Sequence, residues 1–438
     1  METKRSSLGK AILSKRRFVV IAIVLCLMLF VALSATTIAA AEDDFVLGVY
    51  GNANEDDTID MRDLTYVKLI FFGERPETEL ADAKYDGEIN PLDFVQIKLV
   101  IVGKENVLTL VDSADRIVTV KKPVERAVLA SGNSAYFAEA IQIFGAENKI
   151  VGVSDFIKMD DIYQPELSKL PSVGGYPADY EAILSLNPDL VTVPYHVAEK
   201  AEKLLPGITV VALNFWNPDV FTEEMTKLGY IFGKKDEAKH YIGDFHDKYI
   251  DLIKEETEKL SEEEKPKMYL EIGYGAYKTY GAKASTQQFL DITGGKNIFA
   301  DIPKISVEVD PEAVVERNPD IIISYISPGK DTGGRGYLSD DISKLKAVWE
   351  DIMNRPELAN VTAVKNRRVY IINSGFQYGA EYPIALTYWA KWFHPDLFED
   401  LDPQAIHQEY IYAFFGIDFN VYEHGVFVYH PEQHPDGH

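Results

Sequence analysis

The sequence predicts an α/β fold: two α/β sandwich lobes joined by one long helix, preceded by a small all-α domain with two calcium-type loops. Two segments, Glu181–Val191 and Glu312–Ile322, carry Glu, Ala, Asn, Pro and Asp in the same register. Strand-like apolar runs alternate with helical segments in both halves of the chain, which is typical of an α/β sandwich. From about Asp236 to about Leu260, apolar residues recur at helical spacing among charged ones, and this pattern predicts the joining helix.

Each repeated segment predicts a short helix, a stop and a buried strand. The stop is expected because a proline disfavours the helical conformation in the asparagine that precedes it. The strands that follow, Leu190–Val193 and Ile321–Ile323, are apolar runs of the kind found in parallel sheets covered on both faces. A repeat of this size indicates two similar lobes, and two lobes leave a cleft between them.

The remaining pattern completes the two lobes. In the first half we expect a hairpin and a strand within 108–130, a helix at Phe137–Phe144, and strands at Ile150–Val153 and Ile208–Ala212. In the second half we expect strands at Met268–Ile272 and Arg368–Ile372 and a helix at Gln287–Thr293. The predicted divisions are a secretion segment at 1–41, the small all-α domain at 42–106, the first lobe at 107–225, the joining helix region at 226–263, the second lobe at 264–400 and a C-terminal extension at 401–438.

The first 41 residues predict export. Basic residues precede an apolar run from Phe18 to about Leu33, and small residues stand at Ala39 and Ala41, as at a signal-peptide cleavage site. An uncleaved anchor is the alternative, because Phe18–Ala40 is long enough to span a bilayer. Either route predicts a secreted, extracytoplasmic protein at the cell surface.

Composition narrows the chemistry of the exported part. The single cysteine, Cys26, lies inside the apolar segment, so the mature protein is expected to have no disulfide and no cysteine metal site. The formal charge of -25 argues against a nucleic-acid partner, because binding to phosphate needs a basic surface.

Two acidic loops in residues 42–106 carry oxygen side chains at the positions by which EF-hand-type loops hold calcium. The expected Ca²⁺ ligands are Asn52, Asn54, Asp56, Thr58 and Asp63 in the first loop, and Asp82, Asp86, Glu88 and Asp93 in the second. Apolar helices are expected to follow at Leu64–Phe72 and Phe94–Val102. A spacer that is merely acidic is the alternative, but two loops in register speak against it.

The two loop–helix units, over about 47–103, resemble a type I dockerin. The resemblance implies calcium-dependent folding and docking to a cohesin-type protein. Two positions depart from the dockerin pattern: Lys84 stands at a ligand position of the second loop, and Asp57 replaces a glycine of the first. We therefore expect the first site to be intact and the second to be weaker.

Residues 108 to about 400 resemble ABC-transporter substrate-binding proteins of the class that carries iron(III)-siderophores, haem and cobalamin. The matching motifs are the opening hairpin with Pro123 and Arg126, the segments Phe144–Gly152 and Gly294–Phe299, and both Glu…Asn-Pro-Asp repeats. The resemblance implies that Glu181 and Glu312 meet arginines of a membrane permease. The alternative is that each glutamate is only an acidic residue favoured in the first turn of a helix.

Ligands of open α/β sheets bind beyond the carboxyl ends of the strands. The loops expected there are rich in aromatic residues and poor in charge, which suits a bulky ring-bearing or chelate ligand. Arg335, in a glycine-rich stretch, is expected to meet an anionic group of the ligand; for any single residue, packing within its loop is the alternative. The candidates are Asn133, Ser134, Tyr136, Tyr195, His196, Phe215, Trp216, Tyr274, Tyr277, Tyr325, Ser327, Arg335, Tyr337, Phe376, Gln377 and Tyr378, of which Ser134, Tyr136, Tyr195, Trp216, Tyr274, Tyr277, Tyr325, Arg335 and Tyr378 are the main ones.

The expected function is capture of a ferric chelate and its delivery to a permease, with a corrinoid as the close alternative and a calcium-assembled surface module without a transport role as a third. No nucleophile, phosphate-loop or zinc-protease motif indicates an enzyme, although paired-carboxylate hydrolases have no local motif. Histidines crowd the C-terminus at His424, His430, His434 and His438. Pro431 and Pro435 would break a helix that aligned them, so we expect a disordered end rather than a metal site.

Overall fold

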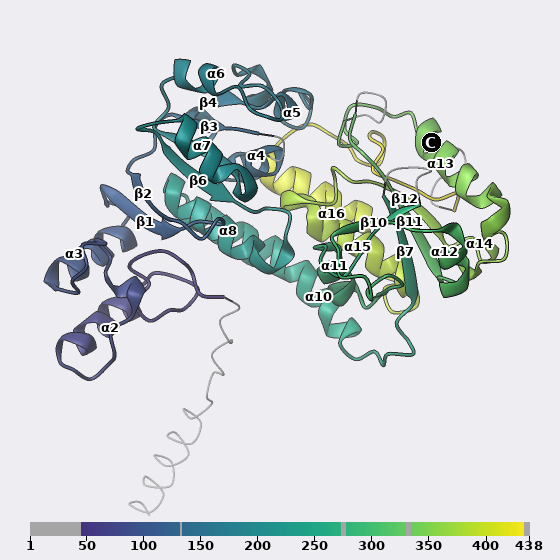
Figure 1. Ribbon diagram of the computed structural model, residues 1–438, viewed down its shortest axis with the longest axis horizontal. Helices are drawn as coiled ribbons and strands as arrows, with labels where there is room; N and C mark the ends of the chain where they lie inside the picture. Colours follow the sequence, from purple (N-terminus) through teal and green to yellow (C-terminus); the bar gives the residue numbers. More distant parts are fainter. Residues whose placement is uncertain (1–44, 132–133, 273–276, 330–333, 433–438) are drawn as a thin grey trace, which may run out of the picture. The chain divides into compact units, whose positions relative to one another are not determined.

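The computed structural model describes residues 45–131, 134–272, 277–329 and 334–432 (Figure 1). The expected secretion segment at 1–41, with Cys26, lies outside these ranges. None of the helices within them has the length and apolar character needed to cross a bilayer.

The N-terminal unit contains two helices, α2 (Met61–Phe71) and α3 (Pro91–Ile101), with a short 3-10 helix at Glu79–Ala81 between them. Both helices begin earlier than the sequence pattern predicted, because each starts with a reciprocal cap. The Asp60 side chain caps α2 and Asp63 caps back; Asn90 and Asp93 do the same for α3. The last residue of each calcium-type loop therefore also belongs to the first turn of a helix.

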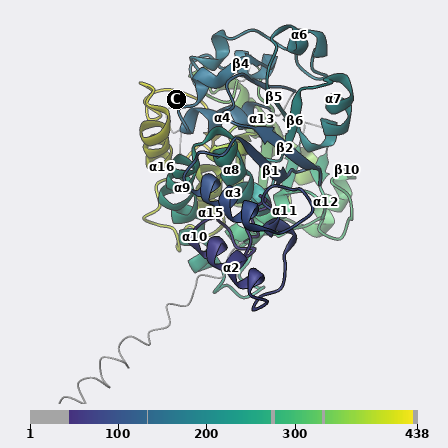
Figure 2. The same cartoon turned by 90° about the vertical axis from the view of Figure 1, so that its left-hand side faces the viewer.

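This unit packs against the first lobe. The Tyr50 amide donates to the Thr109 carbonyl at 2.9 Å, and the Ile59 amide donates to the Tyr230 hydroxyl at 3.0 Å. In both ribbon views the unit lies beside the hairpin of β1 (Val107–Val111) and β2 (Ile117–Lys121) (Figures 1 and 2). These bonds to the hairpin and to the helix that carries Tyr230 fix the unit on a single lobe.

The first lobe is built on a parallel four-stranded sheet of order β4-β3-β5-β6. Apolar residues on one face, among them Val128, Val191 and Val210, pack with residues of the covering helices into one core. The elements are β3 (Ala127–Leu129), α4 (Ser134–Ile143), β4 (Ile150–Val153), α5 (Asp155–Lys158), α6 (Tyr180–Ser185), β5 (Leu190–Pro194), α7 (Ala198–Leu204), β6 (Thr209–Leu213) and α8 (Pro218–Phe232).

The second lobe repeats the arrangement with a five-stranded sheet of order β13-β12-β11-β7-β9, parallel except for its edge strand β13. Strands β8 (Lys278–Tyr280) and β10 (Ser306–Glu308) form a separate antiparallel pair. The other elements are β7 (Lys267–Ile272), α11 (Thr286–Thr293), β9 (Lys296–Asn297), α12 (Pro311–Arg317), β11 (Ile321–Ile326), α13 (Ser343–Asn354), α14 (Thr362–Lys365), β12 (Val369–Asn373), α15 (Tyr382–Phe393), α16 (Pro403–Tyr410) and β13 (Val428–Tyr429).

The repeated segments are equivalent in three dimensions. The predicted stop falls at Asn187 and Asn318, whose left-handed φ angles are 47° and 44°. The aspartate that follows each Asn-Pro pair ties its strand to the neighbouring one: the Asp189 carboxylate accepts the Arg126 amide at 3.1 Å, and the Asp320 carboxylate accepts the Lys267 amide at 2.9 Å. The expected order of helix, stop and buried strand is confirmed in both lobes.

The joining region runs through α9 (Lys235–Tyr241), a π-helical segment at Ile242–Asp247 and α10 (Lys248–Thr257). The expected helix at 236–260 is therefore present, but its middle is wound as a π-helix. Tyr241 and Phe245, on either side of the change in winding, are fully buried. Helix α8 spans 218–232, across the boundary expected at residues 225 and 226.

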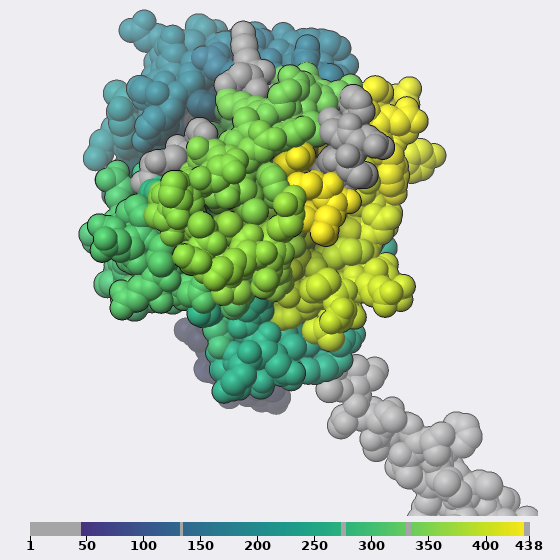
Figure 3. All heavy atoms as spheres, turned by 90° about the vertical axis from the view of Figure 1, so that its right-hand side faces the viewer, coloured from purple at the N-terminus to yellow at the C-terminus, as the bar shows by residue number. Residues whose placement is uncertain are grey.

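The C-terminal extension is folded as far as Glu432, and the expectation of a disordered end is wrong for that part. Helix α16 is followed by a π-helical segment at Ile411–Phe415, and β13 pairs with β12 through Ile371 and Tyr429. Figure 3 shows the last described residues, in yellow, lying against the green second lobe. His430 is buried and its ring nitrogen meets the Arg367 carbonyl at 2.9 Å, whereas His434 and His438 lie outside the described residues. Apolar residues such as Phe419, Val426 and Phe427 anchor this segment in the lobe.

Candidate functional site

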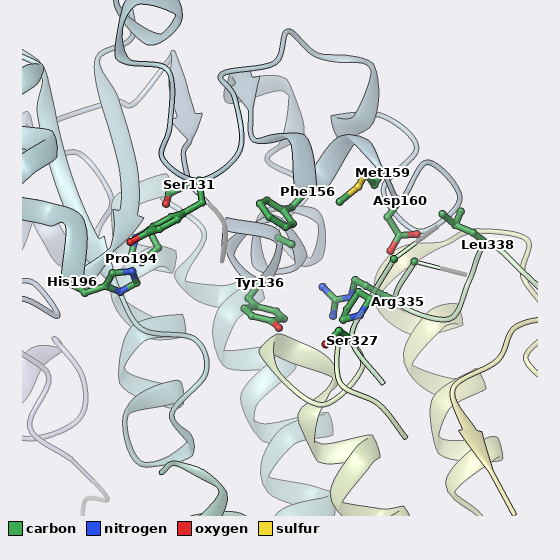
Figure 4. A pocket seen from close by; sticks show the side chains of 16 residues that line it. Ser131, Tyr136, Phe156, Met159, Asp160, Pro194, His196, Ser327, Arg335 and Leu338 are labelled. Carbon is green, nitrogen blue, oxygen red and sulfur yellow. The ribbon is translucent and has the colours of Figure 1, made fainter. Parts of the chain in front are cut away.

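A cavity of about 500 Å³ lies between the two lobes, beyond the carboxyl ends of their parallel strands (Figure 4). The first lobe contributes α4, α5 with the residues after it, and the end of β5; the second contributes the loops after β11 and β12 and residues 334–338. This is the position that ligands take in open α/β sheets. The lining residues are Ser131, Ala135, Tyr136, Phe156, Met159, Asp160, Tyr176, Pro194, His196, Ser327, Pro328, Gly329, Gly334, Arg335, Leu338 and Gly375.

The lining is mostly apolar or aromatic. Phe156, Met159 and Tyr176 are 42%, 41% and 63% exposed in the first lobe, so their side chains are available to a ligand. Pro328 and Leu338 face them from the second lobe. Such walls suit a large, flat-sided molecule that is held mainly by contact area.

An ionic cluster lies beneath the cavity and joins the two lobes. The Arg335 guanidinium pairs with Glu139 of α4 and, at 2.6 Å, with Glu381 before α15. The Tyr337 hydroxyl binds Glu381 and meets the ring of His407 at 2.7 Å. All five side chains are buried, and burial raises the pKa of Glu139 to about 8 despite the opposing effect of Arg335. Arg335 lines the cavity as expected, but it is already paired with two carboxylates of the chain, so its contact with a ligand anion stays a prediction.

Asp160 is the other charged residue that the described lining contains. Its side chain follows α5, is only 3% exposed, and lies on the same side of the cavity as Arg335 (Figure 4). No hydrogen bond of ordinary geometry reaches either carboxylate oxygen from the described residues, although the nearby Tyr163 amide favours the charged form and lowers the pKa of Asp160. Burial raises the pKa of Asp160 to about 7, against the lowering influence of Arg335.

An aromatic group flanks the cavity at His196. Tyr195 stacks on Trp216 with ring centres 5.5 Å apart, and His196 lies 6.2 Å from both Trp216 and Tyr176. Tyr195 is 41% exposed and does not line the cavity itself. The predicted Tyr195 and Trp216 therefore support the wall through His196.

Of the nine main predicted ligand residues, Tyr136 and Arg335 line the cavity. Tyr378 packs against Tyr136 at 5.9 Å, and Tyr325, 5% exposed, lies on β11 away from the lining. The Tyr277 hydroxyl donates to Glu357, which gives this residue a place in the packing of the second lobe. Ser134 begins α4, but its side chain, like Asn133 and Tyr274, lies outside the described residues.

The α5 segment, which supplies Phe156, Met159 and Asp160, is missing from the residues predicted to bind the ligand. The signal was present: residues 155–160 directly follow the predicted strand Ile150–Val153, at the carboxyl end where ligand loops are expected. The predicted ligand residues lie in the loops after the other strands. Asp160 is an ordinary acidic residue in the sequence, and only the fold reveals its burial.

Glu181 and Glu312 occupy equivalent places. Each is the second residue of a short helix, α6 or α12, and each is exposed. Asp179 and Asp310 cap these helices from the preceding residue by accepting backbone amides. The caps satisfy the helix ends, so both glutamate side chains extend into solvent, one on each lobe.

In the first calcium-type loop, side-chain oxygens turn toward the loop's own backbone. Asn52 accepts the Asp56 amide at 3.2 Å, Asp56 accepts the Thr58 amide at 3.0 Å, and Asp63 accepts the Asn54 amide at 3.2 Å. The Asn54 side-chain oxygen is buried and has no partner among the described residues. Burial raises the pKa of Asp63 to about 6.

The second loop has the same backbone bonds, and each loop has a cation beside its central aspartate: in the first loop the Arg62 guanidinium lies 2.9 Å from the Asp56 carboxylate. Asp82 accepts the amides of Asp86 and Gly87 at 3.1 and 2.8 Å, and Asp93 accepts the Lys84 amide at 3.0 Å. The Lys84 ammonium lies 3.2 Å from the Asp86 carboxylate. Within the described ranges, no three side chains of His, Cys, Asp or Glu converge as a ready metal site.

Two α/β lobes that share one aromatic cavity define a two-lobed solute-binding protein. Residues 129–375 match the model of the family described as Periplasmic binding protein, and the chain belongs to this family. Its relatives include a substrate-binding lipoprotein of an ABC transporter.

Two curated relatives and one solved structure illustrate the family. An uncharacterized ABC transporter substrate-binding lipoprotein, YvrC of Bacillus subtilis, is 26% identical over 61% of this chain and 78% of its own length. A vitamin B12-binding protein of Vibrio parahaemolyticus is 23% identical over 56% of this chain and 88% of its own. The TroA-like periplasmic binding protein FepB of Veillonella parvula has the same fold, with a TM-score of 0.61, 24% identity, and coverage of 74% of this chain and 99% of its own.

Proposed function

We propose that this protein is the extracytoplasmic substrate-binding component of an ABC importer and that it captures a metal chelate, a ferric siderophore or a corrinoid, between its lobes. The observation that carries the proposal is the cavity of about 500 Å³, walled by aromatic and apolar side chains from both lobes. Its position at the strand ends supports ligand capture. The vitamin B12-binding relatives favour a corrinoid as one form of the chelate.

Delivery is proposed to use Glu181 and Glu312 as contacts with permease arginines. One exposed glutamate per lobe, at the same position of an equivalent helix, supports this role. An arginine–carboxylate pair formed at a protein surface positions two partners and aligns them. With one contact on each lobe, the permease would sense both lobes at once.

Calcium binding by the N-terminal loops is a second part of the proposal. The first loop gathers oxygens from Asn52, Asn54, Asp56, Thr58 and Asp63, a donor set that fits a hard cation. The buried, unpartnered oxygen of Asn54 supports it. Both loops have a cation beside the central aspartate, but the second loop is proposed to bind more weakly because Lys84 stands at a ligand position and supplies an ammonium group in place of an oxygen. A cohesin-type protein is the partner proposed for this unit.

Thermal unfolding of the protein without residues 1–41, measured with and without chelates, tests the receptor function. A ligand that binds only the folded state raises the melting temperature, by an amount that corresponds to about 2.7 kcal/mol at a hundredfold excess over Kd. Ferric hydroxamates, ferric catecholates, haem, cobalamin and cobinamide form the panel. No shift with any of them would contradict the proposed function and favour a surface module without a transport role.

A further inference from the structure

The charges that line the cavity suggest which chelates it accepts. Among the described lining residues, Asp160 and Arg335 carry formal charge. Glu139 and Glu381 pair with the Arg335 guanidinium, which reduces the positive charge that this residue offers to a ligand. Among the described lining residues, Asp160 is therefore a carboxylate without an ion-pair partner, and Arg335 is a guanidinium paired with two carboxylates.

The Asp160 carboxylate is a buried hydrogen-bond acceptor for which the described residues provide no donor of ordinary geometry. Its two carboxylate oxygens are buried and have no hydrogen-bond partner in the described chain, which is a costly state for a polar group. A buried acceptor of this kind becomes favourable when a ligand brings an N–H or O–H group to it. Because Asp160 lines the cavity, a molecule held there lies beside the residue.

The surroundings of Asp160 strengthen the preference. Asp161, beside it in the chain, adds a second negative charge nearby, and Glu381 acts in the same direction. The net charge of the whole chain is also strongly negative, at -25. A like charge within about 6 Å of the Asp160 carboxylate is expected to lower affinity about a hundredfold at the effective dielectric constant of a protein site.

We propose that the cavity selects neutral or cationic metal chelates whose edge carries amide, ammonium or hydroxyl donors, and that Asp160 accepts a hydrogen bond from that edge. The inference rests on the proposed function and narrows it. Corrinoids with amide side chains and ferric hydroxamates satisfy it. Haem, with its propionates, and ferric tricatecholates, which are polyanions, do not.

Two matched ligand pairs test the selection by calorimetric titration at pH 8, above the raised pKa of Asp160, where its carboxylate carries a charge. The corrinoid pair is dicyanocobinamide and dicyanocobyrinic acid, in which carboxylates replace the amides. The siderophore pair is a ferric trihydroxamate with a free ammonium group, ferrioxamine B, and a ferric tricatecholate. In whichever class binds, the donor-bearing member is expected to bind at least about a hundredfold more tightly. Equal affinity within a pair would overturn the inference.

Asp160→Asn assigns the selection to one residue, because the change removes the charge and preserves the shape. In this variant the ratio of the two dissociation constants within a pair is expected to fall at least about tenfold from its hundredfold value. The main cause is tighter binding of the anionic member. Asp161→Asn, on an exposed neighbour, is the matched control and should change this ratio less than about threefold. An unchanged ratio in Asp160→Asn would overturn the assignment.

The two failures are distinguishable. If the unmodified protein binds none of the four ligands, the proposed function fails, and this inference with it. If it binds the anionic members as well as the others, the function stands and the inference alone fails. Asp160→Ser serves as the second variant if Asp160→Asn does not fold, and the same fall in the ratio is expected from it.

Discussion

Asp160 is held in surroundings that oppose its charge, and this makes it a pH-sensitive residue of the ligand-free protein. Burial raises its pKa from the ordinary 3.8 to about 7. Between about pH 4 and pH 7 the folded state therefore holds a proton that the unfolded state has lost. The contribution of this residue to stability is fully present below pH 4 and is lost as the pH rises to 7.

The residue-scale prediction is that Asp160→Asn gains stability relative to the unmodified protein as the pH rises from 5 to 7, by at most about 1.4 kcal/mol per pH unit. Above pH 7 the difference should level off. Urea unfolding at pH 5, 6, 7 and 8 measures it. Comparison with the variant cancels the titration of Glu139, whose pKa is also raised by burial. A difference that stays constant with pH would show that Asp160 is not held protonated.

At the scale of elements, the twin helices α6 and α12 are the clearest product of the sequence repeat. Their capping aspartates, Asp179 and Asp310, hold each helix start in place, while Glu181 and Glu312 take no part in a described side-chain contact. Removing the two glutamates should therefore leave the fold and the cavity intact.

The double variant Glu181→Ala, Glu312→Ala is expected to bind ligand with unchanged affinity and to change the melting temperature little, since surface substitutions are usually within about 0.5 kcal/mol. Uptake in cells that depend on the protein should fall at least about tenfold. Glu199→Ala with Glu316→Ala, exposed residues on α7 and α12, is the matched control and should support normal uptake. Normal uptake by the first variant would contradict the docking role.

The N-terminal loops give the second element-scale prediction. Calcium should raise the melting temperature of the unmodified protein, because the ion binds the folded loop and not the unfolded chain. Asp63→Ala, which removes a first-loop oxygen donor, should abolish most of the effect; Asp93→Ala, in the weaker second loop, should remove less. Equal losses in the two variants would contradict the proposed order of the sites, and no response to calcium would contradict the calcium proposal.

The elements predicted from sequence were those whose local signals agree with the fold. The parallel strands were found because they are apolar runs bounded by Asn-Pro or glycine, and a strand buried on both faces needs no other pattern. The π-helical segment at 242–247 was not foreseen, because its side chains keep helical spacing. The C-terminal extension was misjudged, because its order depends on distant partners such as Ile371 and Gly336.

The cavity could be predicted in place but only partly in composition. Strand ends located the loops that hold Tyr136, His196 and Arg335. The role of Arg335 was beyond local reasoning, since Glu139 and Glu381 lie far from it in the sequence and reach it only in the folded protein. Burial of Asp160 likewise depends on how the lobes meet.

At the scale of the whole molecule, the ring of Tyr163 makes a packing contact between the two lobes, in addition to the Arg335–Glu139 pair. Tyr163 of the first lobe is stacked between Tyr337 and Phe415, with centroids 4.4 and 4.5 Å away. Its hydroxyl lies 3.1 Å from that of Tyr410. The C-terminal extension therefore takes part in the contact between lobes, and the lobes are tied at this point as well as through the joining helix.

Tyr163→Ala is expected to cost about 3–5 kcal/mol of stability, as for other large aromatic residues removed from a core. Amide exchange should quicken in the segments that carry Tyr337 and Tyr410, because they lose their partner in the other lobe. Tyr412→Ala is the control, because Tyr412 is 82% exposed and belongs to the π-helical segment that also carries Phe415. This change should lower the free energy of unfolding little. Unchanged exchange at these segments would show that other contacts between the lobes, such as the Arg335–Glu139 pair, keep them in place.

The seating of the N-terminal unit on the first lobe has a mechanical consequence. The Tyr50 and Ile59 amides bond to that lobe. A partner bound to residues 47–103 would therefore hold the first lobe directly and the second lobe only through the contacts between the lobes. Attachment through residues 47–103 does not involve the residues that line the cavity. A protein attached in this way could therefore bind and release its ligand while it stays attached.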